Sequence, residues 1–303
     1  MLEGDAAREA VASAGRRTTS RRELQRHEHF EEVSPEVGQL DAEAFDSLLA
    51  EEPDEALALL ADLNGATDER LRQLAHRLSA QVVVDVARTG APARRGIGRL
   101  APMAGAEGDL DLDRSLDAVV AARRRGERPS AADLVARTWR RTDTAVCLLV
   151  DRSGSMAGAR LAAAVVTAAA VALRPGGDTS VVAFSGDAIV LRSQGGSRAA
   201  GDVVVDLCRL RGAGVTDLGL ALRVASDQLS RSRAGRRVAV LLSDCRATAG
   251  GDPLDHLGVG ELVVLAPGDD TADAEAFADA AGLRWAPLES PSTAPQALDA
   301  VLR

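Results

Sequence analysis

Several residue types are missing or scarce in this chain of 303 residues, which makes some classes of function improbable. The sequence contains no lysine, which excludes a phosphate-binding loop that needs one, so we expect no ATP hydrolysis. Aromatic residues make up 2% of the chain, which disfavours a surface that stacks nucleic-acid bases. The net charge of -9 also argues against general nucleic-acid binding.

Long apolar runs and paired cysteines are absent as well. The apolar run 161–173 is too short to span a membrane, and the N-terminus lacks the basic and apolar segments of a secretory signal. The three cysteines, Cys147, Cys208 and Cys245, are an odd number, which favours buried free thiols in a reducing compartment. We therefore expect a cytoplasmic protein that has no membrane partner.

The stretch 151–155, which reads Asp-x-Ser-x-Ser, is the most informative part of the sequence. An unbroken apolar run at 145–150 precedes it and predicts a central parallel strand that is buried on both faces. A buried helix is expected at 161–173, so the stretch begins at the carboxyl end of the strand and continues into the loop before the helix. In open α/β sheets such loops line the crevice that binds ligands.

One carboxylate and two hydroxyls on alternate residues suit a hard metal ion. Asp151, Ser153 and Ser155 offer only oxygen ligands, which favour Mg²⁺ or Mn²⁺ over zinc or copper. The alternative is that Ser and Asp simply cap the helix, and this motif alone leaves both interpretations open.

Two later stretches, a second motif at 216–217 and a third at 244, add ligands of the same kind to the first motif at 151–155. Thr216 and Asp217 follow a glycine-containing loop and precede a helical pattern, while Asp244 follows a second buried strand at 237–243. In a doubly wound sheet these loops can lie beside the first, so the three stretches together favour a metal site.

With these residues the sequence resembles the von Willebrand factor A family. The resemblance implies a metal-ion-dependent adhesion site in which Ser153, Ser155 and Thr216 are hydroxyl ligands. Asp151 and Asp244 would hold the ion directly or through water. One coordination position would stay open for an acidic side chain of a partner.

The chain departs from the family pattern at one position and adds a carboxylate at another. Many relatives have glycine directly after the aspartate that corresponds to Asp244, where this chain has Cys245. A hydrolase with a nucleophilic cysteine is therefore an alternative. Its only neighbouring histidine in sequence is His256. Asp217 either orients the site from outside the ligand set or lies in the first turn of the next helix, where an acid is favourable.

The remaining sequence divides into regions of different character. Residues 1–30 carry mixed charge and predict a mobile or weakly helical tail, and 31–88 predict a helical region. Its second helix starts at Pro53, and Thr67 is expected to cap its third. Residues 89–142 are interpreted as a linker that wraps the metal domain, which occupies 143–303.

The linker carries a second resemblance. The acidic run 108–113, an arginine-rich span and Trp139 resemble the bacterial intracellular branch of the family. That branch includes carbon monoxide dehydrogenase accessory proteins and proteins that act beside MoxR-type AAA+ ATPases. The resemblance covers roughly residues 88–303.

We therefore expect a Rossmann-like, doubly wound α/β domain with a mostly parallel sheet, one antiparallel edge strand and a small all-α region before it. The expected function is that of a non-enzymatic, Mg²⁺-dependent adaptor that works with a MoxR-type AAA+ ATPase in metalloenzyme maturation or protein remodelling. A non-ATPase subunit of a metal-chelatase-like complex is the alternative.

Overall fold

The computed structural model describes residues 1–14, 18–90, 99–104, 109–110, 112–124, 135–140, 144–153, 158–174, 178–210, 214–258 and 260–303. The chain forms two compact units. One contains Met1–Pro92 together with Thr144–Arg303, and the other contains Ala93–Asp143.

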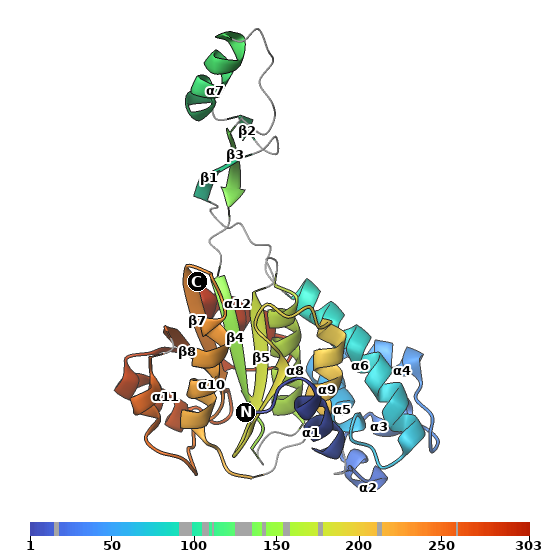
Figure 1. The fold of residues 1–303 in the computed structure, drawn as a ribbon. Coiled ribbons are helices and arrows are strands. Elements are labelled where there is room, and N and C mark those ends of the chain that lie inside the picture. Colours follow the sequence, from blue (N-terminus) through green and yellow to red (C-terminus); the bar gives the residue numbers. More distant parts are fainter. Residues whose placement is uncertain are drawn as a thin grey trace. The chain divides into compact units, whose positions relative to one another are not determined.

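A six-stranded sheet forms the centre of the larger unit (Figure 1). The strand order is β6-β5-β4-β7-β8-β9, and every neighbouring pair is parallel except β5 and β6. The strands are β4 (Thr144–Asp151), β5 (Thr179–Phe184), β6 (Ala188–Arg192), β7 (Arg236–Leu242), β8 (Glu261–Pro267) and β9 (Arg284–Leu288). This arrangement confirms the predicted fold class, including the antiparallel strand at one edge.

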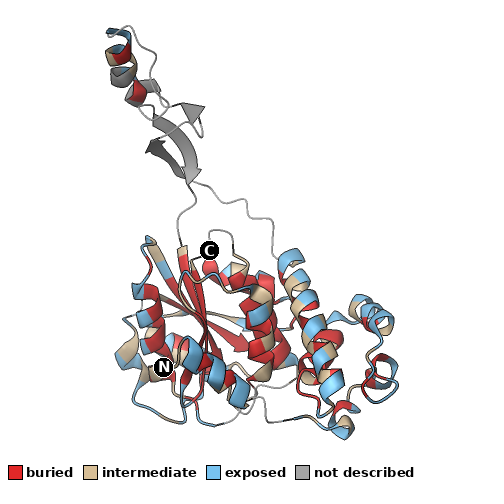
Figure 2. Ribbon diagram, turned by 45° about the vertical axis from the view of Figure 1, so that its right-hand side comes forward, coloured by how far each residue is buried: buried red, intermediate tan, exposed pale blue. Residues whose placement is uncertain are grey.

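Helices cover both faces of this sheet. Apolar residues of α8 (Ala159–Ala172) and α12 (Ala294–Leu302) share one buried cluster with one sheet face. Those of α10 (Leu218–Ser230) and α11 (Ala272–Ala281) share a second cluster with the opposite face. Because β4 is covered on both sides, almost all of its side chains are buried, as its unbroken apolar sequence predicts (Figure 2).

The helical region packs against the first face of the sheet domain rather than forming a separate core. It consists of α4 (Ala42–Glu51), α5 (Pro53–Leu63) and α6 (Glu69–Thr89), which share the cluster that contains α8 and α9 (Ala200–Arg209). Pro53 starts α5, as predicted. The predicted cap of α6 is wrong by one residue, because Asp68 accepts the capping bond from the backbone N–H of Leu71.

Residues 1–30 differ from the predicted mobile or weakly helical tail. They contain α1 (Asp5–Ala14) and α2 (Arg21–Leu24), and α3 (Phe30–Val33) begins at their end. Val11, Leu24 and Phe30 are buried in the cluster that contains α8. The segment is held by this packing and by Leu2, whose backbone pairs with Ile189 at the edge of the sheet. Tertiary burial supplies the stability that its charged composition did not indicate.

The smaller unit has its own secondary structure, where the sequence had suggested a linker. Its strands β1 (Arg99–Ala104), β2 (Asp109–Leu110) and β3 (Val135–Arg140) form an antiparallel sheet of order β1-β3-β2. One helix, α7 (Leu112–Arg124), follows β2 in the chain.

Candidate metal centre

Asp151 lies at the carboxyl end of β4, as predicted, and its residue is 1% exposed. Its Oδ1 accepts a hydrogen bond of 2.8 Å from the backbone N–H of Ser153, and its Oδ2 accepts one of 2.6 Å from the Ser243 hydroxyl. Burial raises the pKa of the Asp151 carboxyl, and the nearby charge of Asp244 raises it further. The carboxylate is therefore held in place by neutral donors in a setting that disfavours its charge.

The first motif is only partly visible in the structure. Ser153 lies directly beyond β4, and its backbone orients the Asp151 carboxylate. Ser155, the second predicted hydroxyl ligand, lies outside the described residues, as do its neighbours 154, 156 and 157. The predicted helix after the loop is α8, with Gly158 at its N-cap position.

The third motif lies beside the first because β7 pairs with β4, and Val150 stands opposite Leu242. Asp244 follows two residues later and is 7% exposed. Its Oδ1 accepts a hydrogen bond of 3.1 Å from the backbone N–H of Arg246. The two predicted carboxylates thus follow the carboxyl ends of adjacent central strands.

Cys245 has the left-handed backbone conformation, with φ of 61°, and it alone among the described non-glycine residues has positive φ. Its backbone N–H donates a bond of 2.9 Å to the same Ser243 hydroxyl that serves Asp151. The side chain is buried, and burial raises the pKa of its thiol to about 12. A glycine would adopt this turn without strain, which explains why glycine is common at this position in the family that the sequence resembles.

The second motif lies against the loop that follows Asp244. The backbone N–H of Thr216 donates to the Thr248 hydroxyl at 2.8 Å, and the Thr216 carbonyl accepts from the Thr248 N–H at 3.0 Å. Thr216 is buried, and both bonds use its backbone rather than its hydroxyl. Structure therefore brings the loop of Thr216 to the same edge of the sheet as Asp151 and Asp244.

Asp217 is the N-cap of α10, so the interpretation that places it in the first turn of this helix is wrong by one residue. Its Oδ1 accepts a bond of 2.8 Å from the Leu220 N–H. Gly250, with φ of 87°, approaches so closely that a Cβ there would lie 2.4 Å from this oxygen. An orienting role for Asp217 toward an ion stays a prediction.

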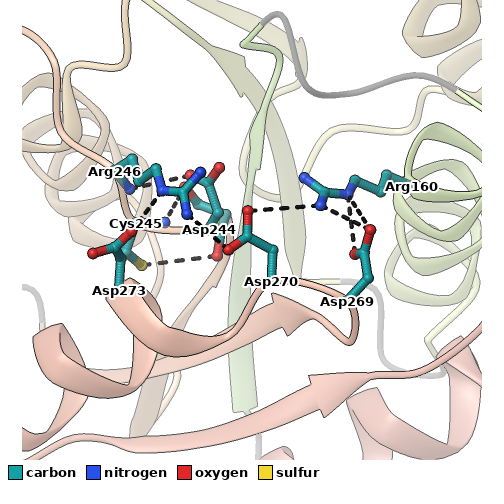
Figure 3. A network of polar contacts seen from close by, with 8 residues as sticks. Arg160, Asp244, Cys245, Arg246, Asp269, Asp270 and Asp273 are labelled. Atoms are coloured by element: carbon teal, nitrogen blue, oxygen red, sulfur yellow. Dashed lines mark hydrogen bonds and ion pairs between the residues drawn. The ribbon is translucent and has the colours of Figure 1, made fainter.

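A chain of ion pairs borders the same edge (Figure 3). Asp270 pairs with Arg246 at 2.9 Å and with Arg160 at 3.6 Å. Arg160 also binds Asp269 through two nitrogens, and Arg246 binds Asp273. These ion pairs link the first turn of α8 to the loops after β7 and β8.

The donor set at this edge fits a hard divalent cation. It offers two buried carboxylates and the hydroxyls of Ser153 and Thr216, all of them oxygen donors. Among the described residues, no arginine forms an ion pair with Asp151 or Asp244. Arg160 and Arg246 pair with other aspartates, which are the main cause that raises the pKa of each guanidinium, and the nearby charge of Asp244 adds to this. Across the described ranges no group of three His, Cys, Asp or Glu residues is arranged to hold a metal, so any ion here must rely on hydroxyls.

Sequence reasoning missed the residues that support the site. Ser243 was visible directly before Asp244, and its position at a strand end was the only available signal. Thr248 and the ion-pair chain had no sequence signal, because they meet the site only through the packing of separate loops.

None of the described helices has the length and apolar character needed to cross a membrane.

No curated protein matches the sequence. A von Willebrand factor type A protein from Catenulispora acidiphila is 21% identical over 54% of this chain and 42% of its own, with a TM-score of 0.43. This chain therefore spans less than half the length of that protein.

Two Bacteroides proteins are similar at the same level. An aerotolerance-related membrane protein from Bacteroides fragilis is 18% identical over 52% of this chain and 98% of its own, with a TM-score of 0.43. BatB from Bacteroides thetaiotaomicron is 15% identical over 52% of this chain and 97% of its own, with a TM-score of 0.40.

The family model described as VWA domain containing CoxE-like protein matches residues 74–288, which is more than half of the chain. The chain therefore belongs to the CoxE-like family of VWA-domain proteins.

Proposed function

We propose that this protein is a Mg²⁺-dependent protein-binding adaptor, with Mn²⁺ as an alternative ion. Asp151, Ser153, Ser155, Thr216 and Asp244 would hold the ion. The observation that carries the proposal is the pair of buried carboxylates that follow neighbouring strands, held by neutral donors and without an arginine partner among the described residues. Two like charges are thus buried near each other with no ion pair to either one in the described part of the chain, and a divalent ion would neutralise both.

The partner would supply an acidic side chain to the ion. Five residues of this chain would fill at most five of the six positions that Mg²⁺ prefers, which leaves one for a further oxygen ligand. Because the chain supplies only two formal negative charges, the ion can still attract a carboxylate. The residues of this chain would orient the ion. Ser243 and the Ser153 N–H hold Asp151, and the Arg246 N–H holds Asp244. Contact between the proteins should therefore require both the metal and a carboxylate.

We further propose that the partner is a MoxR-type AAA+ ATPase or its client, in metalloenzyme maturation or protein remodelling. Membership of the CoxE-like family supports a role in protein interaction. The chain itself contains no lysine with which to form a nucleotide-binding loop, so a separate protein would provide the ATPase activity.

We propose no enzymatic activity for the chain alone. Against a hydrolase that uses Cys245, the thiol is buried and burial raises its pKa to about 12, whereas a nucleophilic thiol needs a lowered pKa. Iodoacetamide at pH 8 should therefore leave Cys245 unmodified in the folded protein. Rapid alkylation at this residue would favour the hydrolase alternative.

A non-ATPase subunit of a metal-chelatase-like complex is the second candidate, because it would use the same metal site. It differs in that the complex would carry out metal insertion. A captured partner that inserts a metal ion into a tetrapyrrole would favour it over the adaptor.

The central test is affinity capture from native cytoplasm in Mg²⁺ or in EDTA, with bound proteins identified by mass spectrometry. Wild type is compared with Ser153→Ala and with a matched control, Ser230→Ala, whose hydroxyl binds the Asp227 carbonyl away from the site. We expect an AAA+ ATPase with wild type and the control in Mg²⁺ only. Equal capture in EDTA, or by Ser153→Ala, would contradict the metal-dependent interface.

A further inference from the structure

A cavity of about 230 Å³ lies beside the candidate metal centre, between the ends of β7, β8 and β9 and the first turn of α8. Most of its wall is apolar. The apolar lining residues are Ala159, Ala163, Leu242, Pro267, Leu288 and Pro291.

The cavity and the metal edge share residues and contacts. Leu242 lines the cavity, and Asp244 follows two residues later in the same chain segment. Arg160 also lines the cavity and contacts Asp270, which pairs with Arg246 (Figure 3). The Arg246 N–H also binds Asp244, so one series of contacts joins the wall of the cavity to the candidate metal centre.

The size and the charges of the cavity restrict its occupant. Its volume is below the range of about 300–1,000 Å³ that small-molecule sites have, and it suits a single side chain. The acidic side chains of Asp269 and Glu289 contribute to the lining, and Asp269 is 67% exposed. Arg160 is already engaged by Asp269 and Asp270. A carboxylate is therefore disfavoured there, while an aliphatic side chain meets apolar walls.

We propose that this cavity takes one aliphatic side chain, such as leucine, isoleucine or methionine, from the partner segment that presents its carboxylate to the ion. The recognised feature is an acidic residue and an aliphatic residue at a fixed spacing. This inference rests on the proposed function, because the carboxylate is assigned to the metal. It adds a specificity that the metal alone does not provide, since any exposed carboxylate fits an open coordination position.

Two contacts keep the wall in position. The Gly268 N–H donates to the Leu288 carbonyl at 3.0 Å, and a Cβ on Gly268 would lie 2.9 Å from Oε2 of Glu289. On the other side, Asp54 of α5 accepts a bond of 2.8 Å from the Ser292 N–H, next to the lining residue Pro291. The helical region thus contributes one contact to the segment after β9 that lines the cavity.

The test uses the full chain and a displayed library of random 12-residue peptides, selected in Mg²⁺ or in EDTA. The cavity variant is Ala159→Leu, which places a larger side chain at the first residue of α8. Its matched control is Ala272→Leu, the same change at the first residue of α11, which does not line the cavity. Selected peptides are then resynthesised and their Kd values are measured for each protein.

Wild type and Ala272→Leu should select peptides with an acidic and an aliphatic residue at constant spacing. Ala159→Leu should lose the preference for an aliphatic residue and keep the preference for an acidic one. Its Kd for a peptide that the wild-type protein selected should be at least about tenfold higher than that of the wild type. An acidic preference without any aliphatic one in wild type, or equal selection by the two leucine variants, would overturn the inference. So would failure to enrich any peptide.

The same experiment separates this inference from the proposed function. If the aliphatic preference persists in EDTA and the acidic residue is absent under both conditions, the metal-dependent contact fails. The assignment of an aliphatic occupant to the cavity would then stand without its link to a carboxylate. If the acidic residue depends on Mg²⁺ and the aliphatic preference is missing, only the cavity inference fails.

Discussion

The Ser243 hydroxyl donates a hydrogen bond of 2.6 Å to Oδ2 of Asp151, and this contact joins the segment that follows β7 to the last residue of β4. The same hydroxyl oxygen accepts the Cys245 N–H at 2.9 Å. One side chain therefore holds the first carboxylate and shapes the turn that contains the second, Asp244. This makes Ser243 a positioning residue for both.

Removal of this hydroxyl should weaken both the fold and ion binding. We expect Ser243→Ala to destabilise the protein by about 1–3 kcal/mol, because a buried carboxylate and a buried N–H each lose a partner. Urea unfolding measures the change, and Ser13→Ala, whose hydroxyl is at the surface, is the control. A loss no greater than that of the control would show that water or another group replaces the hydroxyl.

Added Mg²⁺ should stabilise the wild-type protein but not a variant that lacks the negative charge of Asp151. At a Mg²⁺ concentration about 100 times the Kd, the free energy of unfolding should rise by about 2.7 kcal/mol. Asp151→Asn keeps the size of the side chain but removes its charge, so its stability should not respond to Mg²⁺. Thermal unfolding with and without Mg²⁺ measures this, and an equal shift in both proteins would place the ion elsewhere.

The left-handed conformation of Cys245 leads to an unusual order of stability among its variants. Cys245→Ala and Cys245→Gly both remove the thiol, but alanine retains the cost of about 1–2 kcal/mol for a left-handed backbone. We therefore expect Cys245→Gly to be about 1 kcal/mol more stable than Cys245→Ala in urea unfolding, whereas glycine normally is the less stable. If alanine proves more stable, the turn must relax to another conformation.

His27 should make stability depend on pH, because it joins the N-terminal segment to α5 of the helical region. Its Nε2 lies 3.0 Å from Asp62 and its Nδ1 lies 2.8 Å from Glu55. The hydrogen bond to Asp62 is the main cause that raises the pKa of His27, and the bond to Glu55 adds to it against the opposing effect of burial.

Because the folded pKa is above the unfolded one, this contribution is fully present below about pH 6.5 and is lost as pH rises through the folded value. His27→Gln should therefore cost about 1 kcal/mol at pH 5.5 and clearly less at pH 9, as measured by urea unfolding. A constant difference across this range would show that His27 does not titrate in the folded protein.

Much of the sheet domain could be predicted because local patterns agree with the tertiary structure. The unbroken apolar runs of β4 and β7 indicate strands that are covered on both faces, and Pro53 marks the start of α5. The N-terminal segment was not predictable in the same way. Its buried residues Val11, Leu24 and Phe30 are separated by charged ones, and only their packing on the sheet domain orders them.

Local sequence patterns are sufficient to predict which chemical groups are available: aspartates directly after two expected strands, hydroxyls at fixed spacing, and no lysine. These follow from local patterns, because a strand and its following loop are contiguous. Tertiary packing, by contrast, is what makes Ser243 bridge the two strand ends and Thr248 hold the loop of Thr216. It also decided that a cavity adjoins the site, since that depends on how four separate segments pack at one edge of the sheet.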